Sequence, residues 1–452
     1  MNIEKISPMR RLLAIVSITS GIGNMGLCFS VLNTILALIA KDLHASILEL
    51  QWILNIYGIF IATFLVLMGR LGDRFGYKKI FCLGLLFLVI STFGTSFSSS
   101  PLSVIFFQAF FGLAGAILLP VSQVLLIQMY PPSKENKAMS LWVMAGGLTL
   151  AFGPVAAGIF TQFGSWRLPF ELMGVVSFIS LVLAIFCIPE PKKHERQALD
   201  FVGTILLMLT IAVFVLAVME TGTWRIPVII ALYLLSIFLL VILLVLEKKA
   251  INPIIQEYLF TDRVFLCASI GNALLIFYIW CELFLLPLYL QNTLGKSILY
   301  TGISLLSVTA PLTLCSLFVG KIYPKFGAKK LMVTGYLLLM FATLLELKLG
   351  ADTSIFWVIL PSLFFGVAWA LIQVPAATSA MSGLKSSHAG AGAGTFNTLQ
   401  EIGGVVGLTI VVTVVRLHSS FLVGLHEGVW TLIVFVFIGL AFSLGLPNRR
   451  PS

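Results

Sequence analysis

The chain has 452 residues, of which 59% are hydrophobic and 10% are charged, and its mean hydropathy is +1.07. A soluble globular protein has about 25% charged residues, so this composition excludes that class and indicates a membrane protein. The net charge of +10 could suit nucleic-acid binding. However, the basic residues lie between long apolar runs, and we attribute them to membrane topology.

Fourteen apolar runs are long enough to cross a bilayer, which requires ~20 apolar residues per helix. The gaps between them leave no room for a soluble domain. We therefore expect an all-α polytopic membrane protein. In chain order the expected spans are 13–40, 50–69, 79–98, 102–129, 138–162, 168–188, 201–219, 226–246, 264–290, 300–320, 330–349, 355–381, 389–415 and 428–446.

The charges between the runs predict the orientation of the chain. If the N-terminus is cytoplasmic, all but six of the 28 Lys and Arg residues fall on the cytoplasmic side. This asymmetry follows the positive-inside rule and predicts that both termini lie in the cytoplasm. The six basic residues on the other side are Lys41, Arg167, Arg225, Lys296, Lys348 and Arg416.

A glycine-rich basic segment, GRLGDRFGYKK, occupies residues 69–79 between the second and third runs. Its glycines allow a tight reversal and a close approach of the flanking helices. Asp73 lies where the amide groups of a helix N-terminus can contact a carboxylate. A solvated charged turn is the alternative, which the glycine spacing disfavours. The residues with an expected function are Gly69, Arg70, Gly72, Asp73, Arg74, Gly76, Lys78 and Lys79.

The fifth run, 138–162, carries small residues around a proline, namely Gly153, Pro154 and Gly158. Small residues permit tight packing of helices in lipid, and a proline kinks a helix. A pliable seam and ordinary helix packing both remain open as interpretations.

The segment GKIYPKFGAKK at 320–330 repeats the pattern of residues 69–79, with Pro324 in place of the aspartate. Each copy lies between the second and third runs of a six-run set, so the repeat predicts two related bundles of like orientation. The expected domains are an N-terminal six-helix bundle at 1–190, a cytoplasmic linker with an inserted helix pair at 191–257, and a C-terminal six-helix bundle at 258–452.

Glu401 is the first candidate for proton coupling. It lies midway between the basic residues that bracket the run 389–415, and it shares a helical face with Asn397 and Gly404. An ionised side chain at the centre of a bilayer costs ~2.5–3.5 kcal/mol, so such residues commonly have a function. The alternative is a structural glutamate that is paired with a neighbouring helix.

Glu282 in the run 264–290 is the second candidate, and a carboxylate at the outer interface is its alternative. Glu346 lies at the outer end of its run, and we expect it at the interface. We expect Arg167 to pair with Glu171, which lies one helical turn later.

Together these segments resemble the major facilitator superfamily, in particular its fourteen-helix drug:proton antiporter group. Residues 69–79 match the superfamily's loop pattern, and residues 153–158 are similar to the group's antiporter motif with Ala157 in place of one glycine. Residues 200–203 and 390–394 also fit. The resemblance implies a central helix pair between two bundles, a conformational latch at the loop, and an antiporter-type seam that favours export.

Two positions depart from that group. It usually carries an aspartate in the first run and an arginine in the fourth, where this chain has Cys28 and Gln108. Because both the aspartate and the arginine are replaced, neither charge is left without its partner inside the membrane. Proton coupling through Glu401 and transport without proton coupling therefore both remain open. The polar residues expected to line a substrate cavity are Cys28, Asn33, Gln108, Asn397 and Gln400.

We expect a secondary active transporter of the cytoplasmic (inner) membrane that exports amphipathic drug-like compounds or metabolites by proton-coupled alternating access. One alternative is a facilitator, importer or exporter of a polar metabolite or siderophore-like chelator without that coupling; another is a membrane sensor that does not transport. The expected partners are a small-molecule substrate, protons and the bilayer, with a monomeric chain and no nucleic acid. We expect no enzyme, no cofactor and no metal site, since no catalytic cluster or metal-ligand spacing is found.

Overall fold

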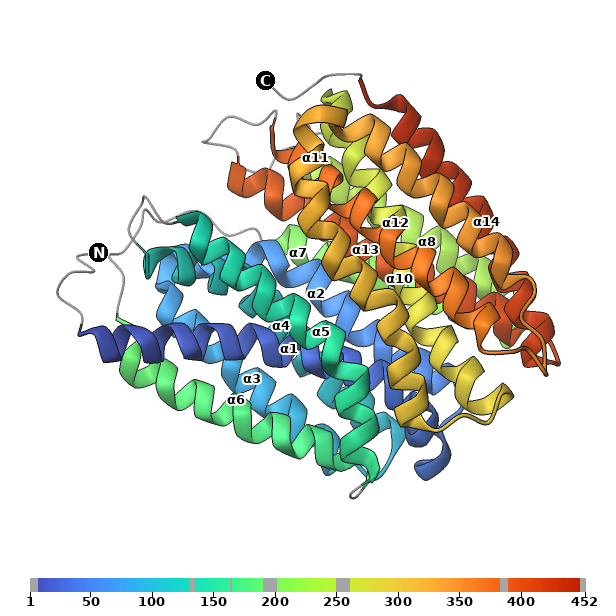
Figure 1. Ribbon diagram of the computed structural model, residues 1–452, viewed down its shortest axis with the longest axis horizontal. Coiled ribbons are helices and arrows are strands. Elements are labelled where there is room, and N and C mark those ends of the chain that lie inside the picture. Colours follow the sequence, from blue (N-terminus) through green and yellow to red (C-terminus); the bar gives the residue numbers. More distant parts are fainter. Residues whose placement is uncertain are drawn as a thin grey trace. The chain divides into compact units, whose positions relative to one another are not determined.

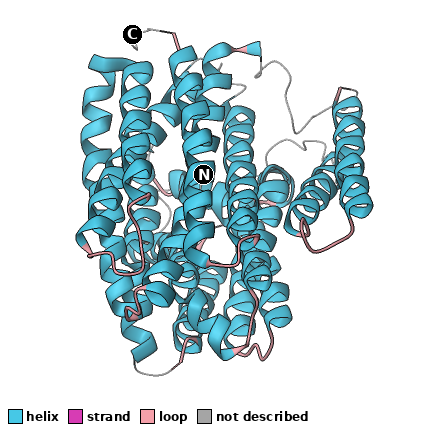
Figure 2. Ribbon diagram, turned by 90° about the vertical axis from the view of Figure 1, so that its right-hand side faces the viewer, coloured by secondary structure: helices cyan, strands magenta, loops and turns pink. Residues whose placement is uncertain are grey.

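The computed structural model describes residues 7–130, 135–162, 165–189, 201–248, 261–382 and 389–447. A few side chains inside its helices, among them those of Arg70 and Asp73, lie outside the described part. Within the described ranges the regular structure is helical and contains no strand (Figure 2). The predicted all-α class is confirmed.

The helices follow the expected apolar runs along the chain (Figure 1). The first eight are α1 (Pro8–Asp42), α2 (Ile47–Phe75), α3 (Tyr77–Ser96), α4 (Pro101–Gln128), α5 (Glu135–Gln162), α6 (Arg167–Cys187), α7 (Phe201–Met219) and α8 (Ile226–Glu247). They are followed by α10 (Arg263–Leu288), the π-helical turn η3 (Tyr289–Thr293), α11 (Ile298–Glu346), α12 (Phe356–Ser382), α13 (Ala389–Arg416) and α14 (Phe421–Gly445).

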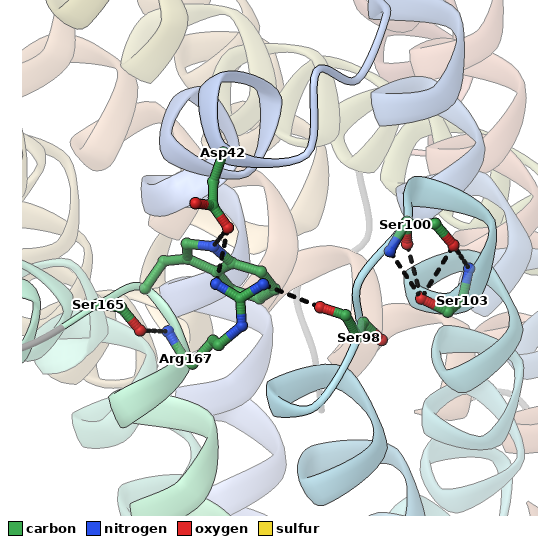
Figure 3. Close-up of polar contacts among 7 residues, drawn as sticks. Asp42, Ser98, Ser100, Ser103, Ser165 and Arg167 are labelled. Carbon is green, nitrogen blue, oxygen red and sulfur yellow. Dashed lines mark hydrogen bonds and ion pairs between the residues drawn. The ribbon is translucent and has the colours of Figure 1, made fainter.

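Short polar segments start several of these helices. Ser46 accepts a hydrogen bond from the amide of Glu49, whose carboxylate accepts one from the Ser46 amide, so that α2 begins with a capping box. Ser100 and Ser103 form the same arrangement at the start of α4 (Figure 3). Asp262 caps α10 by accepting from the amides two and three residues later. The sequence thus fixes where these helices begin.

Thirteen helices or helical segments among the described residues are long and apolar enough to cross a membrane. Two of them, 298–316 and 318–346, belong to α11. Helix α5 has 28 residues and is not among the thirteen; several of its side chains lie outside the described part. The count of fourteen spans stays a prediction.

The chain divides into two compact units. The N-terminal unit comprises Met1–Met208 and Leu243–Ile254, and the C-terminal unit comprises Leu209–Ile242 and Ile255–Ser452. In the N-terminal unit α1 packs against α5 and α6, while α2 and α3 pack against α4. In the C-terminal unit α10 packs against α12, α13 and α14. The inserted pair, α7 and α8, is divided between the units, and the predicted boundaries at residues 190 and 257 stay predictions.

The two copies of the repeated segment share a backbone conformation. Gly76, between α2 and α3, has φ = 100°, and Gly327, at the same position of the second copy, has φ = 74°. Gly327 interrupts α11, so that two helical segments meet there at a kink. Glycine adopts a positive φ without the steric cost of a side chain. The repeat read from the sequence is therefore also a repeat in the backbone.

Candidate functional site

Helices α10 and α13 of the C-terminal unit approach closely because glycines of α13 face α10. A Cβ atom at Gly403 would lie 2.3 Å from the carbonyl oxygen of Ala273, and one at Gly404 would lie 2.6 Å from the Trp280 ring. Real Cβ atoms essentially never come closer than 3.0 Å to a neighbour. The glycines therefore let the two backbones pack at a distance that a side chain would forbid.

Polar side chains cross this interface as a chain of hydrogen bonds. Asn272 of α10 donates from Nδ2 to Oε1 of Gln400 at 3.0 Å, and Gln400 donates from Nε2 to Oε1 of Glu401 at 3.2 Å. Asn272 is fully buried, and the other two are half-buried. Among the described residues, Oδ1 of Asn272 has no donor. The structure thus brings together two of the residues that the sequence singled out, Gln400 and Glu401, and adds Asn272, which sequence reasoning missed.

The remaining polar candidate of α13, Asn397, lies one helical turn before Glu401 and is half-buried. The expectation that Asn397 shares a helical face with the carboxylate follows from this position in α13. Its part in a substrate cavity stays a prediction.

The second candidate carboxylate, Glu282 of α10, lies beside Glu346, the last residue of α11. The two carboxyl groups lie within hydrogen-bonding reach of each other. The hydroxyl of Tyr278 donates to Oε1 of Glu346 at 2.7 Å. Glu346 is buried, with 6% of its surface exposed, and it ends α11, so its expected place at the membrane interface stays a prediction. The end of α11 packs against α10, and this tertiary contact covers the carboxylate.

The cavity candidates of the N-terminal unit make separate contacts. Sγ of Cys28 lies 3.3 Å from Sδ of Met173 in α6. Gln108 donates to Oγ1 of Thr95 in α3 at 3.2 Å, and Asn33 donates to a carbonyl of its own helix at 2.8 Å. No described contact joins the three side chains. A cavity lined by them stays a prediction.

A polar seam between α1 and α6, which sequence reasoning missed, occupies the same region. Asn24 donates to Ser177 Oγ at 2.6 Å, Ser17 donates to the Ser180 carbonyl at 2.7 Å, and the hydroxyls of Ser20 and Ser180 are 2.7 Å apart. On both helices these residues are three or four positions apart, so they lie on one face. That spacing was the signal in the sequence that could have predicted the seam.

Arg167, at the start of α6, pairs with Asp42 and not with Glu171. Its Nη1 atom lies 2.7 Å from Oδ2 of Asp42, and its Nη2 atom donates to the Ser98 carbonyl at 2.9 Å (Figure 3). The indole of Trp166 donates to the same carboxylate oxygen at 2.9 Å. The expected pair within α6 was wrong because the end of α1 brings a carboxylate to the guanidinium. This clamp joins α1, the α3–α4 connection and α6.

The loop between α2 and α3 carries the residues predicted to form a latch. A Cβ atom at Gly72 would lie 2.8 Å from the Tyr77 ring, whereas one at Gly69 would meet its nearest neighbour at an ordinary 3.8 Å. The side chains of Arg70 and Asp73 lie outside the described part. The predicted contact between Asp73 and a helix N-terminus falls there, and the latch stays a prediction.

The antiporter-type seam predicted from the sequence lies in α5, where Pro154 occupies the helix interior. A Cβ atom at Gly153 would lie 2.4 Å from the Ser30 side chain of α1, and Gly158 is buried. Close packing of α1 against α5 accounts for Gly153. A further role of Gly153, Pro154 and Gly158 as a pliable seam stays a prediction.

Apolar spanning helices, an internal repeat and carboxyl groups buried between helices together define a polytopic membrane transporter. The family profile described as the Major Facilitator Superfamily matches residues 18–408. The chain belongs to the Major Facilitator Superfamily, and it is a multi-pass membrane protein that transports a small-molecule substrate.

Curated relatives include several exporters. The chain is 26% identical to the Multidrug export protein EmrB of Haemophilus influenzae, over 84% of this chain and 76% of that protein. It is also 26% identical to the Tetracenomycin C resistance and export protein of Streptomyces glaucescens, over 82% of this chain and 70% of that protein. The uncharacterised transporter YvkA of Bacillus subtilis is 26% identical over 92% of both chains.

Solved structures show the same fold. The nucleoside transporter NupG superposes with a TM-score of 0.70 over 97% of this chain and 100% of that chain, at 11% identity. A bacterial homologue of the lysosomal transporter Spinster superposes with a TM-score of 0.69 over 97% of both chains, at 15% identity. At these identities the likeness concerns the fold alone.

Proposed function

We propose that this transporter exports amphipathic, drug-like compounds across the cytoplasmic membrane in exchange for protons, with both termini in the cytoplasm. The names of relatives at about a quarter identity support efflux. The observation that carries the proton coupling is the hydrogen-bonded chain from Asn272 through Gln400 to Glu401 across the α10–α13 interface.

Protonation of Glu401 would change the strength of this chain. An ionised carboxylate accepts a charge-assisted hydrogen bond from Gln400, and such bonds are about twice as strong as neutral ones. A protonated carboxyl group accepts a weaker bond and gains a donor of its own. The proton therefore changes the bond that holds Gln400, the residue of α13 that accepts from Asn272 of α10. Alternating access requires helices whose packing depends on what is bound, and we place that dependence at this interface.

The test is export of ethidium, a lipophilic cation, from vesicles that contain the purified full chain. Glu401→Gln keeps the size and the hydrogen-bonding capacity of the side chain but cannot bind a proton. We expect the variant to insert normally and to lose export driven by a pH gradient. The matched control is Glu427→Gln, because Glu427 is a glutamate on the exposed face of α14. Wild-type gradient-driven export by Glu401→Gln would remove Glu401 from the coupling site.

Transport without proton coupling is the second candidate. It is favoured by Cys28 and Gln108, which stand where the resembled group carries charges and which pack against uncharged partners in α6 and α3. A facilitator would equilibrate its substrate at the same rate with and without an imposed pH gradient. The vesicle assay therefore separates proton-coupled export from transport without coupling. A chain that transports nothing in either condition would favour the alternative of a membrane sensor that does not transport.

A further inference from the structure

A second acidic site lies along α10, formed by Glu282, Glu346 and Tyr278. Glu346 ends α11, and its Oε1 atom accepts the hydroxyl hydrogen of Tyr278 at 2.7 Å. Its Oε2 atom is buried and has no hydrogen-bond donor among the described side chains. Glu282 lies one helical turn after Tyr278 on the same face of α10, which brings its carboxyl group next to Glu346. Two carboxyl groups thus face each other with one hydroxyl donor between α10 and α11.

Burial keeps bulk water away from Glu346 and Tyr278, whereas Glu282 is half-buried. Glu346 exposes 6% of its surface, and Tyr278 exposes 1%. The Tyr278 ring also packs edge-on against Phe365 of α12, with the centroids 5.0 Å apart. The hydroxyl group is therefore held in place by its surroundings, and its single hydrogen is already donated to Glu346.

The described charged groups nearby are engaged elsewhere. Lys348 stacks over the Trp357 ring at 4.2 Å, Arg416 of α13 bonds to Thr223 and to the Met219 carbonyl, and His426 of α14 bonds to the Leu349 carbonyl. Helix α12 contains no titratable residue. The other described titratable groups at this end of the unit or on the helices packed against α10 are Cys281 on α10, Tyr289 on η3, Lys296 after η3, Tyr300 at the start of α11, Asp352 after α11, Glu401 on α13, His418 between α13 and α14, Glu427 on α14, and Glu220 and Arg225 between α7 and α8.

Two carboxylates this close cannot both be ionised cheaply, because like charges repel strongly at short range in a site that is largely buried. One proton between them removes one charge and supplies the donor that Glu346 lacks. We propose that Glu282 and Glu346 share one exchangeable proton, held in place by Tyr278, and that this carboxyl pair is a proton-binding site of the C-terminal unit. The proton titrates as a property of the pair and not of either residue.

The position of the pair gives it a role in transport, and this role rests on the proposed function. Glu282 is ten residues beyond Asn272 on α10, which is about 15 Å along the helix axis at 1.5 Å per residue. Asn272 contacts the Glu401 site, so α10 carries two acidic sites at different depths. In the proposed orientation the end of α11 is the outer end. The carboxyl pair then takes protons from the outer side, and Glu401 lies deeper.

The experiment counts protons on the purified full chain in lipid nanodiscs. The sample is taken through a pH change across the neutral range without substrate, and an indicator dye reports the protons released per protein. We expect the double variant Glu282→Gln/Glu346→Gln to release one proton fewer than the wild type. The exposed-face variant Glu427→Gln serves as the matched control and is expected to release the wild-type number.

Each outcome decides the proposal. A deficit of two protons would mean that the carboxyl groups bind protons separately, and no deficit would mean that they hold none; either result overturns the shared proton. If the double variant does not fold, Tyr278→Phe keeps both carboxyl groups and removes the donor to Glu346. It is expected to retain the proton count and to change the pH at which the proton is released, and an unchanged pH would overturn the proposal.

The count also separates this inference from the proposed function. Because no substrate is present, the deficit of one proton is expected whether or not the chain exports ethidium. A wild-type protein that shows the deficit but no gradient-driven export would leave the pair in place and overturn the exporter. If export depends on Glu401 but the double variant releases the wild-type number of protons, the exporter is supported and the shared proton of the carboxyl pair is overturned.

Discussion

A methyl group at position 403 tests whether close packing of α10 and α13 maintains the Glu401 site. In Gly403→Ala the new Cβ atom would lie 2.3 Å from the carbonyl oxygen of Ala273. The backbones must separate by at least about 0.7 Å before that contact reaches 3.0 Å. The hydrogen bond from Asn272 to Gln400 is 3.0 Å long and lies beside this contact. The same displacement would stretch it to about 3.7 Å, beyond the range of a hydrogen bond.

Two terms contribute to the expected loss of stability. Overpacking of a close contact costs about 1–3 kcal/mol, and an intramolecular hydrogen bond contributes about 0.5–1.5 kcal/mol. Gly403→Ala should therefore lower the free energy of unfolding by about 1.5–4.5 kcal/mol, the sum of the two terms. Because Gln400 also bonds to Glu401, we expect gradient-driven export to fall together with the stability.

Thermal unfolding of the purified protein measures the first effect, and ethidium export from vesicles measures the second. The control is Gly320→Ala, because no atom lies within 4 Å of a Cβ atom built at Gly320; this exposed substitution within α11 is expected to stabilise by about 0.5–1 kcal/mol, because alanine favours a helix more than glycine does. Wild-type melting and wild-type export by Gly403→Ala would refute the argument. A destabilised variant with full export would show that the packing is structural and not needed for coupling.

The remaining predictions concern the clamp and the repeat. Asp42→Ala removes the acceptor that Arg167 shares with Trp166, and since Asp42 is half exposed we expect a loss of about 1 kcal/mol in unfolding free energy. That loss should shrink in high salt, and a salt-independent loss would contradict an ionic clamp. Gly76→Ala and Gly327→Ala each place a side chain at positive φ, which costs about 1–3 kcal/mol. Thermal melts should show comparable losses for both, and a neutral variant would mean that the local backbone relaxes.

The sequence predicts features that depend on neighbours along the chain. An apolar run, a capping serine or a glycine at a reversal acts within a few residues, so the helices and the turn at Gly76 follow from local pattern. The positive φ of Gly327 also follows from the sequence pattern, because the repeat places Gly327 at the position that Gly76 occupies in the first copy. Membership of the superfamily follows from the same local motifs.

Contacts between distant helices could not be predicted in this way. Helical spacing suggested Glu171 as the partner of Arg167, but the carboxylate that reaches the guanidinium is Asp42, 125 residues away. The end position of Glu346 in α11 suggested a carboxylate at the interface, but it did not indicate that Tyr278 of α10 donates to it. In both cases the deciding neighbour belongs to another helix, and a periodicity within one helix contains no information about that neighbour.

The polar groups inside the two units differ in a way that bears on coupling. In the described part of the N-terminal unit the α1–α6 seam consists of serine and asparagine groups, and Cys28 and Gln108 replace the charges of the resembled group. Such amides and hydroxyls pass on hydrogen bonds but do not change charge near neutral pH. The C-terminal unit holds Glu282, Glu346 and Glu401 on α10, α11 and α13.

A proton gradient can drive a conformational change only through groups whose proton affinity differs between the conformations. In the proposed exporter that free energy enters through the Glu401 site and the carboxyl pair, which both belong to the C-terminal unit. The two copies of the repeat thus share one backbone geometry, at Gly76 and Gly327, but the two halves differ in their ionisable residues. The first copy retains the loop carboxylate, Asp73, that Pro324 replaces in the second, and the second half holds Glu282, Glu346 and Glu401.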